Sequence, residues 1–348
     1  MTRYKPSLVI GMLSALLLVA CGSSSERPTR PAEEPRPKIG LLMDTLQEER
    51  WQRDRDLFLE RAKELRADVV VESAERDDAK QLQLAQSMLD RGVQALVVVP
   101  HSAEAAAKIV EAAKTRAVPV ISYDRLILEA DIDSYVSYDN RRIGEQQAQY
   151  LRNLAPKGNY ILLGGAQTDH NARLIREGQM NALDDAVKRR DIRIVAAPWT
   201  PDWREDEAMR LTEEALKKAG NQVVAVVASN DITAGGAIKA LEKYGLAGKV
   251  LVSGQDANLE AVRRIVAGTQ TMTVYKPLRP LARGAAATAV QMAQKEKVEG
   301  TSTVDNGLKQ VQAFLYSPIA VHKGFIDQII IKDRFLTKEQ VYGTAGSK

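Results

Sequence analysis

The sequence predicts an α/β protein with two doubly wound domains, each a parallel sheet covered by helices on both faces. Three observations lead to this class. Short apolar, β-branched runs alternate with helix-length segments from Lys38 onward, and these runs are too continuous for a half-exposed sheet. The same alternation begins again after Asp139, and 348 residues suffice for two hydrophobic cores.

Residues 223–256 show the pattern most clearly. One apolar run ends at Asn230 and Asp231, a helix-length segment follows, and a second run ends at Gln255 and Asp256. Ligands of open parallel sheets bind beyond the carboxyl ends of the strands, so Asn230 and Asp256 are candidate ligand-binding residues. Asp231 is better explained as the N-cap of the following helix, because Asp is favoured at that position.

The remaining elements follow from the same periodicity. In the first half we expect strands near 38–43, 69–71, 95–99, 118–122 and 135–137, with helices near 50–65, 79–91 and 103–116. In the second half we expect strands near 159–163, 193–196 and 271–274, with helices near 141–153, 171–188, 206–219, 258–267 and 279–295. A late strand within 307–315 and a final helix complete the chain.

The N-terminus has the features of an export signal. Basic residues precede an apolar stretch, Leu8 to Val19, that is too short to span a bilayer and ends at Ala20-Cys21. This arrangement resembles a bacterial lipobox, which predicts a lipoprotein signal peptide over 1–20 and a lipid on Cys21. An ordinary secretory signal is the alternative. Residues 21–37 are rich in Ser, Pro and charge and predict a disordered tether.

We therefore expect an exported protein, lipid-anchored in the periplasm or on the outer face of the cytoplasmic membrane. Composition and motifs exclude several functions. The net charge of +4 comes from 49 basic and 45 acidic residues without a basic stripe, so nucleic-acid binding is not expected. No dinucleotide fingerprint, P-loop or nucleophile elbow is present. Cys21 is the only cysteine, and the three histidines lack metal-ligand spacing. We expect no metal and no cofactor.

The predicted strand ends and their loops gather side chains that suit a neutral polyol. Carboxylates accept hydrogen bonds from hydroxyl groups, cations and amides donate them, and an indole offers a flat surface to the C–H face of a sugar. A single tryptophan more often packs in a core, but Trp203 lies in a polar loop and is the favoured platform. The candidate residues are Arg50, Trp51, Asp124, Arg125, Asn171, Trp203, Asn230, Asp256 and Lys276.

Several longer motifs resemble one family. ERWQRDRD (49–56), SYDR (122–125), GNYILLGG (158–165), VVASNDITAGGAI (226–238), SGQDA (253–257) and AGTQTMTVYKP (267–277) are similar to segments of the periplasmic D-xylose-binding proteins. These are the substrate-binding components of bacterial xylose ABC importers. The resemblance extends from Lys38 to about Tyr342.

The resemblance implies a type I periplasmic binding protein fold, with a three-strand hinge and a central ligand cleft. It implies one lobe of 38–139 plus 276–311, a second lobe of 140–275 plus 312–342, and a tail of 343–348. By motif, the contacts to xylose are Arg50, Arg125, Asn171, Trp203, Asn230, Asp256 and Lys276, with Trp51 and Asp124 beside them. His170 stands where the family usually has an amide, which bears on the choice among pentoses.

The implied function is a monomeric clamp that captures D-xylose or a related monosaccharide and presents it to an ABC permease and its ATPase. It is not an enzyme. One alternative is a sugar-sensing subunit for a membrane sensor kinase or chemoreceptor, which would use the same clamp. A transcription repressor would need an N-terminal helix-turn-helix where this chain has its export signal. A sugar-modifying enzyme would need a nucleophile or metal constellation, and none is evident in the sequence.

Overall fold

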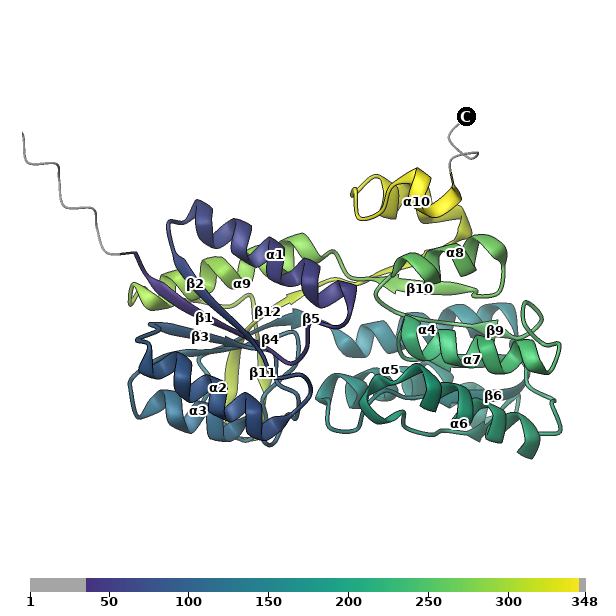
Figure 1. The fold of residues 1–348 in the computed structure, drawn as a ribbon. Helices are drawn as coiled ribbons and strands as arrows, with labels where there is room; N and C mark the ends of the chain where they lie inside the picture. Colours follow the sequence, from purple (N-terminus) through teal and green to yellow (C-terminus); the bar gives the residue numbers. More distant parts are fainter. Residues whose placement is uncertain (1–35, 344–348) are drawn as a thin grey trace, which may run out of the picture. The chain divides into compact units, whose positions relative to one another are not determined.

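The structure is a computed structural model, and it describes residues 36–343. The expected signal peptide, Cys21 and nearly all of the tether lie outside the described residues, as do residues 344–348 of the tail. The described chain forms two groups of elements around separate sheets (Figure 1). No helix within 36–343 combines the length and the apolar character needed to cross a membrane.

The first sheet has seven strands in the order β11-β12-β5-β4-β3-β1-β2. Every neighbouring pair is parallel except β11 and β12. The strands are β1 Lys38–Met43, β2 Asp68–Ser73, β3 Ala95–Val98, β4 Val120–Tyr123, β5 Ser134–Tyr138, β11 Ser302–Asp305 and β12 Gln310–Tyr316.

Helices cover both faces of this sheet (Figure 1). They are α1 Glu49–Glu64, α2 Asp78–Asp90, α3 Ala107–Lys114 and α9 Leu278–Ala293. Successive residues of β1 point to opposite faces, as the period of a strand requires. Leu41 packs in one core with Phe58 of α1 and Leu281 of α9, whereas Leu42 packs in another with Met88 of α2. We call this sheet and its four helices the first lobe.

The second sheet has the order β7-β6-β8-β9, and all of its pairs are parallel. A parallel bridge between Gln255 and Val274 continues it to β10, which pairs antiparallel with β13. The strands are β6 Gly158–Leu163, β7 Ile192–Ala196, β8 Ala225–Ala228, β9 Leu251–Val252, β10 Met272–Tyr275 and β13 Ile319–His322.

Helices α4 to α8 and a C-terminal segment accompany this sheet, and we call the group the second lobe. Helices α4 and α5 pack closely because glycines lie at their contact. A Cβ at Gly144 would overlap the backbone of Ile175, and one at Gly178 would overlap that of Arg141. The helices are α4 Asn140–Leu154, α5 His170–Lys188, α6 Glu205–Lys218, α7 Asp231–Lys243, α8 Leu259–Ala267 and α10 Lys338–Tyr342, with 3₁₀ turns at Pro201–Trp203 and Lys323–Phe325 and a π-helical turn at Asp327–Ile331.

Most predicted elements lie where the sequence placed them, and the differences have local causes. Helix α3 begins at Ala107 rather than Ala103, because Ser102 Oγ accepts from Ala105 N in a turn. The short strands β11 and β13 were not among the predicted elements. The final segment forms 3₁₀ and π turns before α10 instead of one helix.

The last crossing between the sheets also differs from its expected position near Val311. Strand β12 stays paired with β5 as far as Tyr316, and β13 begins the pairing with β10 at Ile319. Residues 312–316 therefore belong to the first sheet, although the sequence assigned them to the second lobe. Val311 and Ala313 are fully buried in the core of the first lobe, which explains why the strand continues through them.

Candidate ligand-binding site

A cavity of about 320 Å³ lies between residues of the two lobes. This volume is at the lower end of the range of about 300–1,000 Å³ that is usual for small-molecule sites. The carboxyl ends of strands from both sheets contribute to its wall, as open parallel sheets generally do at their binding sites. All nine predicted residues line it, namely Arg50, Trp51, Asp124, Arg125, Asn171, Trp203, Asn230, Asp256 and Lys276.

Arg50 connects carboxylates at the centre of the wall. It lies in the first turn of α1, where its Nε is 3.3 Å from Asp54 Oδ2 and its Nη1 is 3.6 Å from Asp256 Oδ1. Its Nη2 donates to Asp124. The guanidinium group also lies 4.2 Å from the centre of the Trp51 ring. Three carboxylates and one indole thus fix the orientation of this cation, and Asp256 belongs to the opposite lobe.

Asp124 follows β4 and is held in a left-handed conformation with φ of 61°. Its backbone oxygen accepts from Ser137 Oγ at 2.5 Å and from Asn171 Nδ2 at 3.0 Å. Burial raises the pKa of its carboxyl group, but Arg50 and Lys276 outweigh burial and lower the pKa to about 2. Asp124 is therefore an ionised acceptor that the surrounding cations keep in place.

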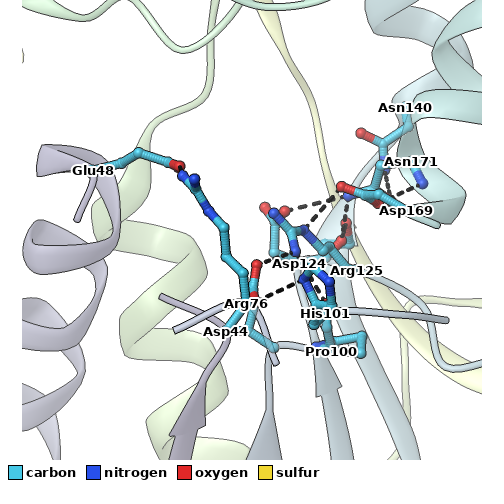
Figure 2. Close-up of polar contacts among 12 residues, drawn as sticks. Asp44, Glu48, Arg76, Pro100, His101, Asp124, Arg125, Asn140, Asp169 and Asn171 are labelled. Carbon is cyan, nitrogen blue, oxygen red and sulfur yellow. Dashed lines mark hydrogen bonds and ion pairs between the residues drawn. The ribbon is translucent and has the colours of Figure 1, made fainter. Parts of the chain in front are cut away.

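Arg125 joins the two lobes through a buried network (Figure 2). Its Nη1 donates to Asp44 Oδ2 at 2.6 Å and to the backbone oxygen of Pro100 at 3.1 Å, both in the first lobe. Its Nε lies 2.9 Å from Asp169 Oδ2 in the second lobe. The Asp44 carboxylate also raises the pKa of His101, whose Nδ1 is 3.1 Å away. The guanidinium group is thus shared between carboxylates of opposite lobes.

Lys276 and Asp256 face each other with unused hydrogen-bonding capacity. Lys276 follows β10 with only 2% of its side chain exposed, and its Nζ lies 3.1 Å from Asp256 Oδ1 and 3.7 Å from Asp124 Oδ2. The Asp256 contact is an ion pair without hydrogen-bond geometry, and Asp256 Oδ1 has no hydrogen-bond partner within the described chain. A hydroxyl group placed between them would find both a donor and an acceptor.

The two asparagines occupy different positions in the wall. Asn171, in the first turn of α5, donates from Nδ2 to Asp124 and accepts at Oδ1 from Asn140 Nδ2 at 2.9 Å. Asn230 is the N-cap of α7, and its side chain accepts from Thr233 N at 2.9 Å. Within residues 36–343, no hydrogen bond is assigned to Asn230 Nδ2, which leaves this amide as a donor at the cavity.

The prediction that Asp231 caps α7 was wrong, because Asn230 does so. Asp231 is the first residue of the helix and 1% exposed, and its carboxylate accepts from Gln270 Nε2 and Thr273 Oγ1, both at 2.9 Å, and from Asn258 N at 3.0 Å. Burial raises the pKa of its carboxyl group to about 7. Sequence alone could not distinguish the two neighbours, since both residue types are good N-caps.

The tryptophans differ in their surroundings. Trp51 is 2% exposed, whereas Trp203 is half-buried in the 3₁₀ turn. The Trp203 ring lies against Gly165, where a Cβ would overlap it. Neither indole Nε1 has a hydrogen-bond partner among the described residues. The third tryptophan, Trp199, instead stacks on Arg176 at 4.4 Å and does not line the cavity.

The cavity wall also contains residues that the sequence analysis did not select. Asp169 lines it and pairs with Arg125, while the neighbouring His170 does not line it. Apolar side chains from the second lobe, Phe335 and Leu336 among them, close another part of the wall. Arg53 of α1 donates to the backbone oxygen of Phe335 at 2.6 Å and lies over its ring at 4.5 Å.

The arrangement suits an uncharged ligand with many hydroxyl groups. The carboxylates and cations largely neutralise each other, and the amides and half-buried indole add polar donors and an apolar surface. Groups of three or more His, Cys, Asp or Glu side chains that could hold a metal ion are not found within 36–343. The role of the nine residues in binding a ligand remains a prediction.

Comparison with known proteins identifies the family. Residues 39–297 match the family model described as "Periplasmic binding protein domain". The chain belongs to the periplasmic binding protein family. Its fold is the type I periplasmic binding protein fold, an α/β architecture with mostly parallel sheets. The family that the sequence motifs indicated is thereby confirmed.

Two relatives with the same printed description are similar over most of the chain. The D-xylose-binding periplasmic protein of Haemophilus influenzae is 48% identical over 305 residues, which covers 88% of this chain and 92% of the relative. The D-xylose-binding periplasmic protein of Escherichia coli is 46% identical over 298 residues, covering 86% and 90%.

Solved structures agree with the fold. A carbohydrate transporter solute-binding protein from Chloroflexus aurantiacus in complex with D-glucose has a TM-score of 0.83 and 28% identity, covering 88% of this periplasmic binding protein and 98% of that chain. A periplasmic solute-binding protein from Actinobacillus succinogenes with bound D-allose has a TM-score of 0.72 and 27% identity, covering 83% and 98%.

Proposed function

We propose that this protein is an extracytoplasmic solute-binding protein that captures D-xylose between its lobes and delivers it to an ABC transporter. The observation that carries the proposal is the cavity lined by Asp256, Lys276 and Asn230, in which Asp256 Oδ1 has no hydrogen-bond partner among the described residues. Relatives that are 46–48% identical and described as D-xylose-binding support the choice of sugar.

The chemistry of the wall fits the hydroxyl groups of a pentose. A hydroxyl both donates and accepts, so the Asp256 carboxylate takes a hydrogen bond from it while Lys276 and Asn230 give hydrogen bonds to it. Trp203 offers an apolar face to the C–H groups of the sugar ring. No step of this binding alters the sugar covalently, and we propose that the protein is not an enzyme.

Contacts between the lobes support a clamp that closes on the ligand. Arg125 pairs with Asp169, and Asn171 donates to Asp124, so each contact joins one lobe to the other. The chain passes between the lobes three times, near Asp139, near Lys276 and at residues 317–318, and we propose these crossings as the hinge. A ligand that contacts both lobes stabilises the closed form, which is the form that the transporter recognises.

A titration with sugars tests the proposed function. The soluble protein from Lys38 onward is titrated with D-xylose by calorimetry, beside ribose, arabinose, galactose and glucose. Saturable binding with xylose tightest is expected. Tighter binding of another sugar would reassign the ligand, and no binding to any of the five sugars would contradict the proposal.

Two variants test whether the titrated sugar occupies the cavity. Asp256→Ala should weaken binding by about 1.5–3 kcal/mol, the usual contribution of a hydrogen bond to a charged group. Asp184→Ala is the matched control, because Asp184 is 51% exposed on α5 and its one ion pair among the described residues is with Lys188. Equal affinities for both variants would remove Asp256 from the site.

We further propose that a lipid on Cys21, outside the described residues, anchors the protein to the membrane. The expressed full-length chain should sediment with membranes, whereas Cys21→Ala should remain in the soluble extracytoplasmic fraction with unchanged sugar affinity. A Cys21→Ala variant that still sediments with washed membranes would contradict the lipid anchor.

A further inference from the structure

The loop at residues 254–258 carries Asp256 into the cavity in an unusual backbone conformation. Asp256 and Ala257 have φ values of 95° and 54°, which residues other than glycine seldom adopt. Such conformations persist only where the surroundings fix them. The contacts that fix this loop therefore determine where the Asp256 carboxylate lies.

Asp231 contacts the loop on both sides of Asp256. Its backbone N–H donates to the oxygen of Gln255 at 3.0 Å, and its Oδ2 accepts from Asn258 N at 3.0 Å. The second carboxylate oxygen accepts from Thr273 Oγ1, which in turn accepts from Ala257 N at 3.3 Å. Asp231 is thus bonded through its backbone to the residue that precedes Asp256, and through its side chain to the residues that follow it.

The loop lies in close contact with the Asp231 side chain. A Cβ at Gly254 would overlap Asp231 Oδ1, so the loop backbone passes directly over the carboxylate. Gln270 Nε2 donates to the same oxygen and is oriented by Arg264, whose Nε donates to Gln270 Oε1 at 3.0 Å. Asp231 is thus enclosed by the loop and by Gln270, and it does not itself line the cavity.

We propose that Asp231 is a positioning residue of the sugar site, which acts by holding Asp256 at the ligand. The inference rests on the proposed function. It extends that function because it assigns a role to a residue with no contact to the ligand. In Asp231→Asn, one oxygen still accepts from Gln270 and Thr273, but the amide nitrogen faces the N–H of Asn258 as a second donor. The loop loses one of its attachments while the side-chain volume is unchanged.

Sugar affinity in a double-mutant cycle is the first test. Asp231→Asn should weaken D-xylose binding roughly tenfold, which corresponds to losing one hydrogen bond of about 1.4 kcal/mol. The same change in an Asp256→Asn background should alter the affinity less than about threefold, because Asp231 then has no Asp256 carboxylate to position. Asp78→Asn, at the equivalent first position of α2 and exposed, is the matched control. Unchanged affinity, or equal effects in both backgrounds, would overturn the proposal.

Amide hydrogen exchange of the ligand-free protein is the second test and does not depend on the sugar. Asp231→Asn should accelerate exchange at Asn258 and Ala257, and leave exchange in the first lobe unchanged. Unchanged exchange at Asn258 would overturn the proposal. If the wild type binds no sugar, the proposed function fails, and the exchange result still decides whether Asp231 holds the loop. Should Asp231→Asn fail to fold, Thr273→Val removes the other side-chain attachment of the loop, that of Ala257 to Asp231 through Thr273, and is tested by both measurements.

Discussion

Replacing Asp169 by Asn tests whether the contact between the lobes holds the ligand in place. Asp169 is the N-cap of α5, where its Oδ1 accepts from Asn171 N at 2.9 Å, and its Oδ2 faces Arg125 of the other lobe. Asparagine is an equally good N-cap, so the helix keeps its cap. The substitution removes the negative charge and turns an amide donor toward the guanidinium group.

The expected magnitude follows from the partners that Arg125 retains. Removing one partner of a fully buried ion pair costs about 3–5 kcal/mol. Here Arg125 keeps Asp44 and the Pro100 carbonyl, so the loss should be closer to that of one charged hydrogen bond, about 1.5–3 kcal/mol. Because the contact joins the lobes, this free energy is lost from the proposed closed form. The dissociation constant for xylose should rise about 10–150-fold, mainly through faster dissociation.

Stopped-flow tryptophan fluorescence measures this rate, since Trp51 and Trp203 line the cavity. Glu177→Gln is the control. It breaks an ion pair of the same α5 helix, but that pair is exposed, lies within one lobe, and should have almost no effect. A dissociation rate within about twofold of the wild type for Asp169→Asn would refute the clamp contact and the estimate drawn from it.

Two further predictions concern pH and packing. Burial raises the pKa of Asp54 to about 6 and that of Asp231 to about 7. The stability that these two carboxyl groups contribute is fully present below their pKa in the unfolded chain, and it is lost as pH rises through their pKa in the folded protein. Urea unfolding should therefore show about 2–4 kcal/mol less stability at about pH 8 than at about pH 5. A smaller loss in Asp231→Asn is expected, and equal stability at both pH values in the wild type would contradict the assignment. Gly165→Ala should displace the Trp203 ring and weaken xylose binding by about 1–3 kcal/mol, measured by calorimetry; unchanged affinity would show that the ring is not a platform.

The candidate residues were predictable because parallel strands place their carboxyl ends at one edge of a sheet. That rule selected Asp124, Asn230 and Asp256 without any knowledge of the pairing order. The side chains that these residues contact were harder to predict from the sequence. Asp54 lies four residues after Arg50 on α1, a spacing that the sequence does reveal. Asp169 meets Arg125 across 44 positions of chain and two lobes, and no local pattern indicates such a pair.

Backbone conformation explains the remaining errors. Asn230 rather than Asp231 caps α7 because the helix begins at Asp231. Helix propensity does not fix the first residue of a helix to within one position. The left-handed residues of the loop after β9 are not glycines, so no sequence signal indicated them. The crossing near Val311 was placed too early because β12 continues for five further residues before Pro318.

The position of β12 has a consequence for how the protein is made. This strand comes from residues 310–316, yet it lies between β11 and β5 in the first sheet. Until residues 310–316 have been synthesised, β5 has an unpaired edge. Helix α9, which covers one face of the same sheet, is also synthesised late, at residues 278–293. The first lobe therefore cannot finish folding until almost the whole chain has been synthesised. Fragments that end before residue 310 should therefore aggregate, because they expose this strand edge.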